Sequence, residues 1–201
     1  MARAGVDPEA IVTAAATLAD SEGLDAVSVK RIAELLGVRP PSLYAHVDGI
    51  DDIVLRLGRR GLHEQASALS RAVEGRSGVD ALVALAGAYR AYAREHPGAY
   101  AASQRSQQLE HDEAAQVAAE AVVRVVLAVL RDYALDGDDA IHAVRLIRVA
   151  LHGFISLEAV GGFAMEQSVD DTYERLVTLL DLGLRSGFPI RATRVREDGL
   201  P

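Results

Sequence analysis

The chain has 201 residues, half of them hydrophobic, so it can bury a substantial core in one small and one larger domain. Its 29 acidic and 21 basic residues give a formal charge of −8, which excludes a protein that coats nucleic acid everywhere but permits a local basic patch. Cysteine is absent, which excludes disulfides, thiolate zinc sites and cysteine nucleophiles.

Two helices are predicted before residue 38. An Asp-Pro-Glu sequence at residues 7–9 is a strong helix start, with an acidic N-cap followed by proline in the first turn. Apolar residues at helical spacing continue up to Gly23, which ends this helix. Ser28 caps the second helix, and Gly37 supplies the left-handed residue that ends it.

A third, short helix is predicted over residues 40–47. Pro40 and Pro41 fit only at or just before a first helical turn, so a helix begins there. Leu43 and Val47 are four residues apart, so both face inward. The outward face of the predicted helix then carries no bulky apolar residue. Such a helix can enter a DNA major groove, so the pattern predicts a helix-turn-helix, although an ordinary three-helix packing unit is the alternative. The predicted core of this unit is Ile11, Leu18, Val27, Ile32, Leu36, Leu43 and Val47.

The charge balance reverses between residues 28 and 47, where three basic residues oppose one acidic residue. Affinity for DNA depends on the phosphates neutralised at the contact, so this local patch is sufficient. Contacts to base edges and thymine methyl groups are expected from Arg39, Pro40, Pro41 and Ser42. Contacts to phosphates are expected from Ser28, Lys30, Arg31, Tyr44 and His46.

After residue 50 the pattern stays helical, with glycine and proline as breaks and no strand-like alternation. Further helices are predicted over residues 51–74, 79–96, 99–109, 114–135, 140–160 and 170–185. The predicted fold is therefore all-α with about nine helices. Its predicted parts are a DNA-binding domain over residues 1–50, a larger helical domain over 51–189, and a polar tail over 190–201. No export segment or membrane span is expected, which favours a cytoplasmic protein.

The last two long helices carry more apolar positions than one small core needs. A second subunit could cover them in a two-fold four-helix arrangement, or they could be buried within their own fold. If a second subunit covers them, the dimer interface is expected at Ile147, Leu151, Ile155, Leu176, Leu180 and Leu184.

If these helices enclose a ligand pocket, it should be apolar with a few placed polar groups. The candidates are Tyr89, Tyr92, Tyr100, Gln104, Gln108, Arg145 and His152. Core packing explains the tyrosines equally well, and a lone histidine on an apolar helix is more often a core or interface residue. Because aromatics make up only 4% of the chain, an aliphatic or amphiphilic ligand of medium size is favoured over a flat aromatic one.

These segments resemble the N-terminal domain of TetR-family transcriptional regulators. The resemblance is carried by the first-helix run AIVTAAATLADSEGLDAVSV, by KRIAELLGV and PPSLYAHV, and by IDDIVLRL at the start of the next helix. It implies a homodimer whose two heads bind a palindromic operator, most often as a repressor, and whose body binds a small-molecule effector that releases the DNA. Residues 148–163 also resemble a subgroup with a Trp-His-Gly signature, in which Leu151 replaces the tryptophan while His152 and Gly153 remain.

One departure concerns residues 48–52, Asp-Gly-Ile-Asp-Asp. Family members commonly carry a phosphate-binding lysine just after the recognition helix, and this stretch has no basic residue. Fewer DNA-backbone contacts than usual are therefore expected. The acidic stretch also slightly favours an alternative, a dimeric adaptor that has lost DNA binding.

An enzyme is not expected, and neither a cofactor nor a metal is expected. A carboxylate-bridged metal oxidase would need Glu-x-x-His pairs on two helices, and Asp139 with His142 is the nearest match. Metalloprotease, phosphate-loop and nucleophile-elbow motifs are also missing. The Glu-His-Asp-Glu sequence at residues 110–113 is interpreted as a solvated connector.

Overall fold

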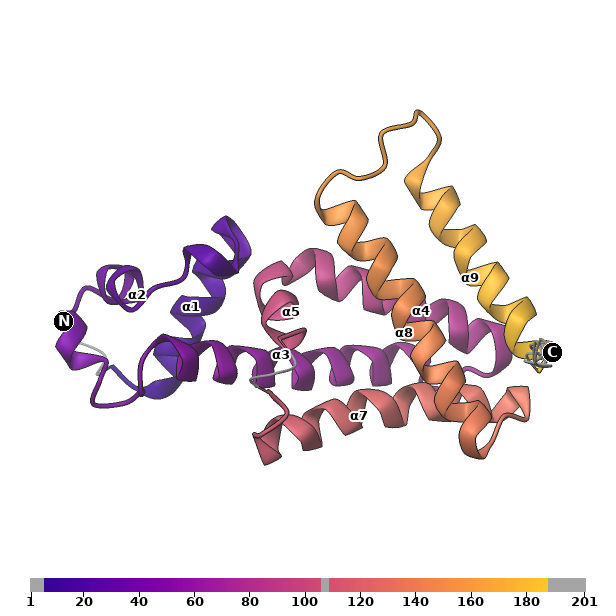
Figure 1. Ribbon diagram of the computed structural model, residues 1–201, viewed down its shortest axis with the longest axis horizontal. Helices are drawn as coiled ribbons and strands as arrows, with labels where there is room; N and C mark the ends of the chain where they lie inside the picture. The colour runs from indigo at the N-terminus through magenta and orange to yellow at the C-terminus, as the bar shows by residue number, and fades with distance from the viewer. Residues whose placement is uncertain (1–5, 106–108, 188–201) are drawn as a thin grey trace, which may run out of the picture.

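The computed structural model describes residues 6–105 and 109–187 (Figure 1). This part of the chain is all-helical and contains no strand, which confirms the predicted fold class. The α-helices are α1 (Pro8–Glu22), α2 (Val29–Leu36), α3 (Ile50–Val73), α4 (Gly78–Glu95), α5 (Pro97–Ser103), α7 (Glu113–Leu130), α8 (Gly137–Ala159) and α9 (Val169–Arg185). Short 3₁₀-helices lie at η1 (Leu24–Ala26), η2 (Pro40–Ser42) and η3 (Arg131–Tyr133).

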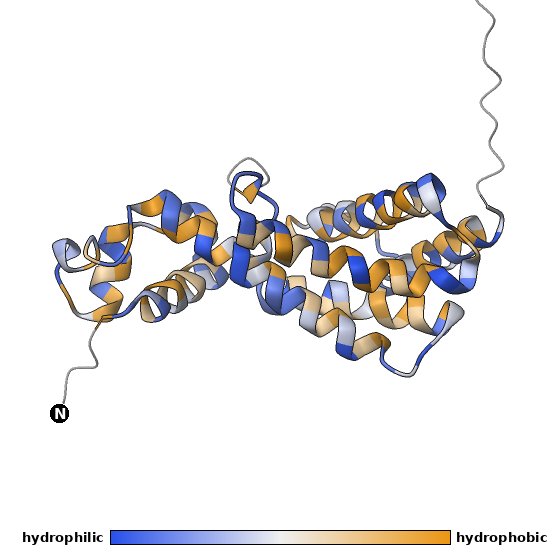
Figure 2. Cartoon of the chain, turned by 90° about the horizontal axis from the view of Figure 1, so that it is seen from below, coloured by the Kyte–Doolittle hydropathy of each residue, from blue (hydrophilic) through white to orange (hydrophobic). Residues whose placement is uncertain are grey.

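The molecule is elongated, with a small head of α1, α2 and η2 at one end and the other helices forming a body (Figure 1). The long helix α3 begins in the head and runs into the body. Both hydrophobic and hydrophilic residues lie along the helices of the two parts (Figure 2). Each helix therefore has an apolar side to pack and a polar side for solvent.

The head is held together by the core that the sequence predicts. Six of the seven expected residues are buried, and Leu36 is partly buried against them. The predicted caps also form: the Asp7 side chain accepts a hydrogen bond from the N–H of Ala10 at 2.7 Å, and the Ser28 hydroxyl accepts one from the N–H of Arg31 at 3.3 Å. Each cap satisfies a helix N–H that has no partner within the helix.

Helix α5 joins the head to the body at very close range. Ala99 and Ala102 of α5 pack into the head's core. A Cβ atom on Gly61 of α3 would lie 2.5 Å from the carbonyl oxygen of Ala99, and one on Gly58 would lie 2.8 Å from that of Ala102. Glycine therefore allows the two helix backbones to touch.

Two predicted elements differ from the structure. Helix α4 ends at Glu95, close to the predicted residue 96, but α5 begins at Pro97 rather than at residue 99, because the missing N–H of proline costs nothing in a first turn. Helix α5 ends at Ser103 rather than near residue 109. Residues 40–47 form a 3₁₀-turn followed by further turns rather than a regular α-helix, so eight α-helices are found in the described residues where about nine were expected.

By length and composition alone, helix α8 is apolar enough to cross a membrane, as core helices of soluble proteins also are. It carries the exposed residues Arg145 and Arg148 and packs against α4, α7 and α9. Packing in a helical bundle explains its buried residues, but one apolar face of α8 stays exposed.

Candidate DNA-binding surface and ligand cavity

The turn between α2 and η2 has the geometry expected for a helix-turn-helix. Gly37 adopts a left-handed conformation with φ 66°, and the N–H of Val38 reaches back to the carbonyl of Ala33 at 3.0 Å. These bonds satisfy carbonyls at the end of α2. Arg39 then has extended backbone, as expected for a residue before proline, and η2 starts at Pro40.

The short segment after this turn is anchored on one side and open on the other. Leu43 and Val47 are buried in the head, as predicted. The N–H of Val47 donates to the carbonyl of Leu43 at 3.1 Å, so the segment keeps a helical turn despite its 3₁₀ start. Most of the outward residues expected to contact DNA bases or phosphates are accessible. Arg39, Pro41, Ser42 and Tyr44 are exposed, and Pro40 and His46 are half-buried.

The residues expected to bind phosphate are not equally available. Lys30 is exposed and lies 3.8 Å from Glu34, a surface pair that holds it weakly. Arg31 instead forms a two-pronged pair with Glu22 of α1, with N–O distances of 2.6 and 2.5 Å. The hydrogen bond from Arg31 lowers the pKa of Glu22 below its ordinary value. Arg31 therefore links α2 to α1 in the free protein.

The acidic stretch after the turn is partly neutralised by α3 itself. Asp52 pairs with Arg56 one turn along at 2.8 Å and accepts a hydrogen bond from the N–H of Asp48 at 3.0 Å. Partial burial acts to raise the pKa of Asp52, but these hydrogen bonds hold it below the ordinary value. The negative charge that Asp52 presents to an approaching phosphate is therefore smaller than the sequence suggests.

The body contains a cavity of about 300 Å³ between α3, α5, α7 and α8. Its volume is at the lower end of the range for small-molecule sites, roughly 300–1,000 Å³. The apolar lining is Leu62, Leu109, Ala115, Ala119, Val122, Val123, Val126, Val144 and Ile147. The polar lining is Gln65, Tyr89, Ser103, Gln104, Glu110, Gln116 and Arg148.

Two of the seven predicted ligand residues, Tyr89 and Gln104, line this cavity. Tyr92 does not, and its hydroxyl donates to Glu64 at 3.1 Å. Tyr100 and His152 pair with each other, with the tyrosine oxygen 2.7 Å from Nδ1. Arg145 is exposed and does not line the cavity. Gln108 lies outside the described residues.

The sequence reasoning missed Gln65 as a cavity residue. It sits on α3 between Leu62 and Leu69, within the stripe of apolar residues that packs into the body. A polar residue that interrupts such a stripe is a signal, because burying an amide without a partner is costly. That signal was available in the sequence.

The apolar residues of α8 and α9 divide between two faces. Ile147, Leu151, Ile155 and Leu184 are buried in their own protomer, and Leu176 and Leu180 are partly buried against the same core. The four buried residues cannot form an interface with another subunit, which corrects their predicted role. The helical period places a different set outside, namely Ile141, Leu146, Val149, Leu157, Val160, Leu179 and Leu182.

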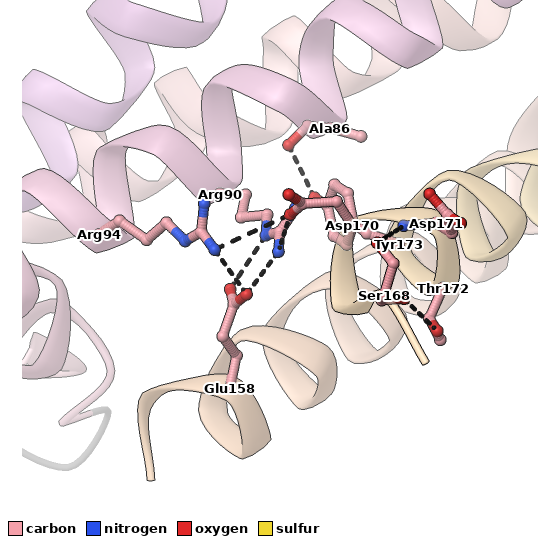
Figure 3. Close-up of polar contacts among 9 residues, drawn as sticks. All are labelled: Ala86, Arg90, Arg94, Glu158, Ser168, Asp170, Asp171, Thr172 and Tyr173. Carbon is pink, nitrogen blue, oxygen red and sulfur yellow. Dashed lines mark hydrogen bonds and ion pairs between the residues drawn. The ribbon is translucent and has the colours of Figure 1, made fainter. Parts of the chain in front are cut away.

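A charged cluster fixes α9 and α8 against α4 (Figure 3). Arg90 of α4 donates to both carboxylate oxygens of Glu158 on α8 and lies 2.7 Å from Asp170 on α9. Arg94 also donates to Glu158, at 2.8 Å. The Arg90 guanidinium stacks 4.6 Å from the ring centre of Tyr173. Arg90 therefore joins three helices through charge and ring contacts.

Asp112, in the predicted connector over residues 110–113, has structural partners. Asp112 caps α7 by accepting from the N–H of Ala115 at 2.6 Å, and it lies 3.9 Å from Arg59. Within residues 6–105 and 109–187, no group of three or more His, Cys, Asp or Glu side chains could hold a metal ion.

A head with an exposed recognition turn, joined to a helical body with a cavity, defines the class of helix-turn-helix regulators. Comparison with known families agrees. Residues 11–57 match the N-terminal model of the bacterial regulatory proteins of the tetR family, and residues 82–180 match a tetracyclin repressor-like C-terminal domain. The chain belongs to the TetR family, whose members are transcriptional regulators rather than enzymes.

Individual relatives support this assignment. The chain is 39% identical over 153 residues to Rv0681 of Mycobacterium tuberculosis, an uncharacterized HTH-type transcriptional regulator, covering 76% of this chain and 70% of that protein. It is 36% identical to YobS of Bacillus subtilis, of the same description, covering 83% and 86%. The fold also matches Streptomyces coelicolor ActR, a TetR family protein solved with (S)-DNPA, with a TM-score of 0.64 at 18% identity, covering 92% and 99%.

Proposed function

We propose that this protein is a ligand-responsive, cytoplasmic transcriptional repressor that binds a palindromic operator as a homodimer. The observation that supports this most is the recognition turn, whose polar residues are uncovered while its two apolar residues anchor it in the head. A turn built in this way presents polar side chains to base edges, and the exposed Pro41 adds an apolar contact surface.

In this proposal Arg39 and Ser42 contact base edges, while Pro40 and Pro41 contact thymine methyl groups. Ser28, Lys30, Tyr44 and His46 hold phosphates. Arg31 contributes less charge than Lys30, since it is already paired with Glu22.

The exposed apolar residues of α8 and α9 form the proposed dimer interface. Leu146, Val149 and Leu157 of α8 and its C-cap residue Val160 follow one another at helical spacing, with Gly153 between them. Nothing in the protomer lies within 4 Å of a Cβ added to Gly153, so a partner helix could approach closely there. On α9, Leu179 and Leu182 are 66% and 58% exposed. Pairing two such faces would create a four-helix arrangement that removes this surface from water.

Helix α5 is the proposed link between the cavity and the head. Its last residue, Ser103, and the following Gln104 line the cavity. At its other end the N–H of Gly98 donates to the Asp20 side chain of α1 at 2.8 Å. A ligand that displaces the end of α5 would therefore shift α1 and the recognition turn. The solved complex of ActR with (S)-DNPA supports the idea that bodies of this fold hold small molecules.

Operator binding tests this function. Purified protein is titrated with the DNA flanking its own gene and with random DNA, at two salt concentrations. Arg39→Ala should cost about 1–3 kcal/mol on the operator and relax specificity at one symmetric base position. Lys30→Ala should weaken both DNAs alike and flatten the salt dependence.

Arg124→Ala is the matched control, because Arg124 is an exposed arginine of the body. It should bind both DNAs as the wild type does. Half-site centres are expected about 34–36 Å apart or at multiples of that repeat. A wild-type protein with equal affinity for operator and random DNA would contradict the proposal and favour the dimeric adaptor.

A further inference from the structure

A buried amide without a partner lies in the wall of the cavity. Gln65 of α3 is only 2% exposed, and its Nε2 atom has no hydrogen-bond partner within the described residues. An unpaired buried donor costs roughly 1–3 kcal/mol, so a structure seldom retains one unless something else satisfies it. A bound molecule in the cavity is placed to do so, since Gln65 lines it.

The other polar groups of the cavity are largely occupied by one another. Arg148 donates to the Gln104 side-chain oxygen at 3.3 Å, and the Gln104 amide donates to the Ser103 hydroxyl at 2.9 Å. The Ser103 hydroxyl donates in turn to the backbone carbonyl of Tyr100 at 2.7 Å. This row of hydrogen bonds uses one acceptor position on Gln104 and one on Ser103, while the guanidinium of Arg148 retains further N–H donors.

Unpaired N–H donors therefore remain in the cavity wall. Gln65 offers two N–H bonds from inside the cavity, and Arg148 offers positive charge from an exposed position on its wall. The one acidic side chain of the lining, Glu110, is exposed. The rest of the wall consists mainly of alanine, valine, leucine and isoleucine, which suits an aliphatic chain.

We propose that the cavity binds an aliphatic molecule with one carbonyl-type oxygen, either a neutral carbonyl or a carboxylate, which accepts a hydrogen bond from Gln65. This inference rests on the proposed function, in which the bound molecule is the effector. A neutral carbonyl needs Gln65 alone. A carboxylate also gains from the charge of Arg148.

Three probes with the same ten-carbon chain separate these possibilities: 2-decanone, decanoate and decylamine. Their binding to the purified full-length protein is measured by calorimetry, without DNA. The ketone or the carboxylate should bind at least tenfold more tightly than the amine, which has no carbonyl oxygen and carries a positive charge. An amide of Gln65 turned the other way would present its oxygen and reverse this order, so preference for decylamine would overturn the proposal.

Gln65→Leu is the decisive variant, because leucine has similar volume and lacks the unpaired donor. The variant should melt at a higher temperature than wild type without ligand, and it should bind the ketone or carboxylate at least tenfold more weakly. A higher melting temperature with unchanged probe affinity would overturn the proposal. Gln65→Asn keeps the donor on a shorter side chain, so it separates the loss of the donor from a change in packing. It should retain part of the affinity for the probe.

Arg148→Leu distinguishes a neutral carbonyl ligand from a carboxylate. It should weaken decanoate and leave 2-decanone unchanged, and Arg145→Leu, on the same helix but outside the cavity, should change neither. If no probe binds, the proposal is wrong. Operator binding is measured separately on the ligand-free protein, so that result would leave the DNA-binding function standing.

Discussion

Where α5 meets α1 and α3, the helices touch through glycine and alanine, whereas α8 and α9 are held to α4 by long charged and aromatic side chains. The first junction has no room for an additional atom at Gly98, Gly61 or Gly58. The second relies on Arg90, Glu158 and neighbouring rings, and leaves apolar side chains exposed. The difference supports the proposals that head and cavity are rigidly connected and that another subunit covers the exposed body surface.

The largest effect is expected from Gly98→Ala at the first junction. The new Cβ would overlap the Cβ of Ala19 and lie 2.5 Å from the Ala19 carbonyl carbon, so α5 and α1 must separate. We expect a loss of about 3 kcal/mol in the free energy of unfolding, the upper end for an overpacked core. Urea denaturation followed by circular dichroism measures this. An unchanged midpoint would show that the junction is looser than its geometry indicates.

Val149→Glu tests the exposed face of α8. Val149 is 70% exposed in the protomer, so the substitution should leave the fold intact, but it would place a charge in the proposed interface. We expect the dimer dissociation constant to rise at least a hundredfold, as measured by sedimentation velocity over a range of concentrations. Val117→Glu, at a 51% exposed valine of α7, is the control and should not affect association. Equal effects from both variants would argue against this interface.

Arg90→Met tests the charged cluster at the second junction. It leaves Glu158, whose side chain is 14% exposed, with Arg94 as its remaining partner. We expect a loss of about 2 kcal/mol, below the usual range for breaking a fully buried pair, because that partner and some solvent remain. Arg94→Met should cost much less, since Arg94 is 55% exposed. Thermal melting of both variants gives the comparison.

The same cluster predicts a dependence on pH. Hydrogen bonding to Arg90 holds the pKa of Glu158 below its ordinary value. A carboxyl with a lowered pKa stabilises the fold fully above its unfolded-state pKa of about 4.3, and this contribution is lost as the pH falls through the lower folded value. Wild type should therefore lose stability more steeply than Arg90→Met as the pH falls below about 5. Denaturant titrations at several pH values measure this. If the free energies of unfolding of wild type and Arg90→Met fell equally with pH, the prediction would be contradicted.

The smallest effect is expected from Gly87→Ala, which makes the same chemical change as Gly98→Ala in open space. Nothing lies within 4 Å of a Cβ at Gly87, which is exposed on α4. The free energy of unfolding should rise by about 0.5–1 kcal/mol, because alanine is the better helix former. Opposite signs for the two substitutions would show that packing, rather than helix propensity, decides the effect at Gly98.

The recognition turn could be predicted residue by residue because its signals are local. Ser28 caps α2, Gly37 adopts the left-handed conformation, and the prolines start the next turn, as expected. Each of these depends on hydrogen bonds or backbone angles within a few residues. The regularity of residues 40–47 was overestimated, since helical spacing of two apolar residues does not distinguish a 3₁₀-turn from an α-helix.

The ligand and interface residues were harder to predict because they depend on contacts between distant segments. Periodicity identified α8 as apolar on several sides, but it could not decide which side faces α4 and which faces outward. As a result, Ile147 and Leu151 were assigned to an interface and lie in the core. Tyr92 and Arg145 were likewise expected to line the ligand cavity. The packing of α3, α5, α7 and α8 places the cavity elsewhere, and neither residue lines it.

The amino-acid sequence by itself determined the all-helical fold, the order of its elements and the side chains on the recognition turn, since caps, prolines and apolar spacing act over a few residues. The tertiary structure alone decided that Gly98 lies against α1, that Gln65 faces a cavity and that Val149 stays exposed. These features depend on the relative placement of helices far apart in the chain, which local hydrogen bonds and periodicity do not specify.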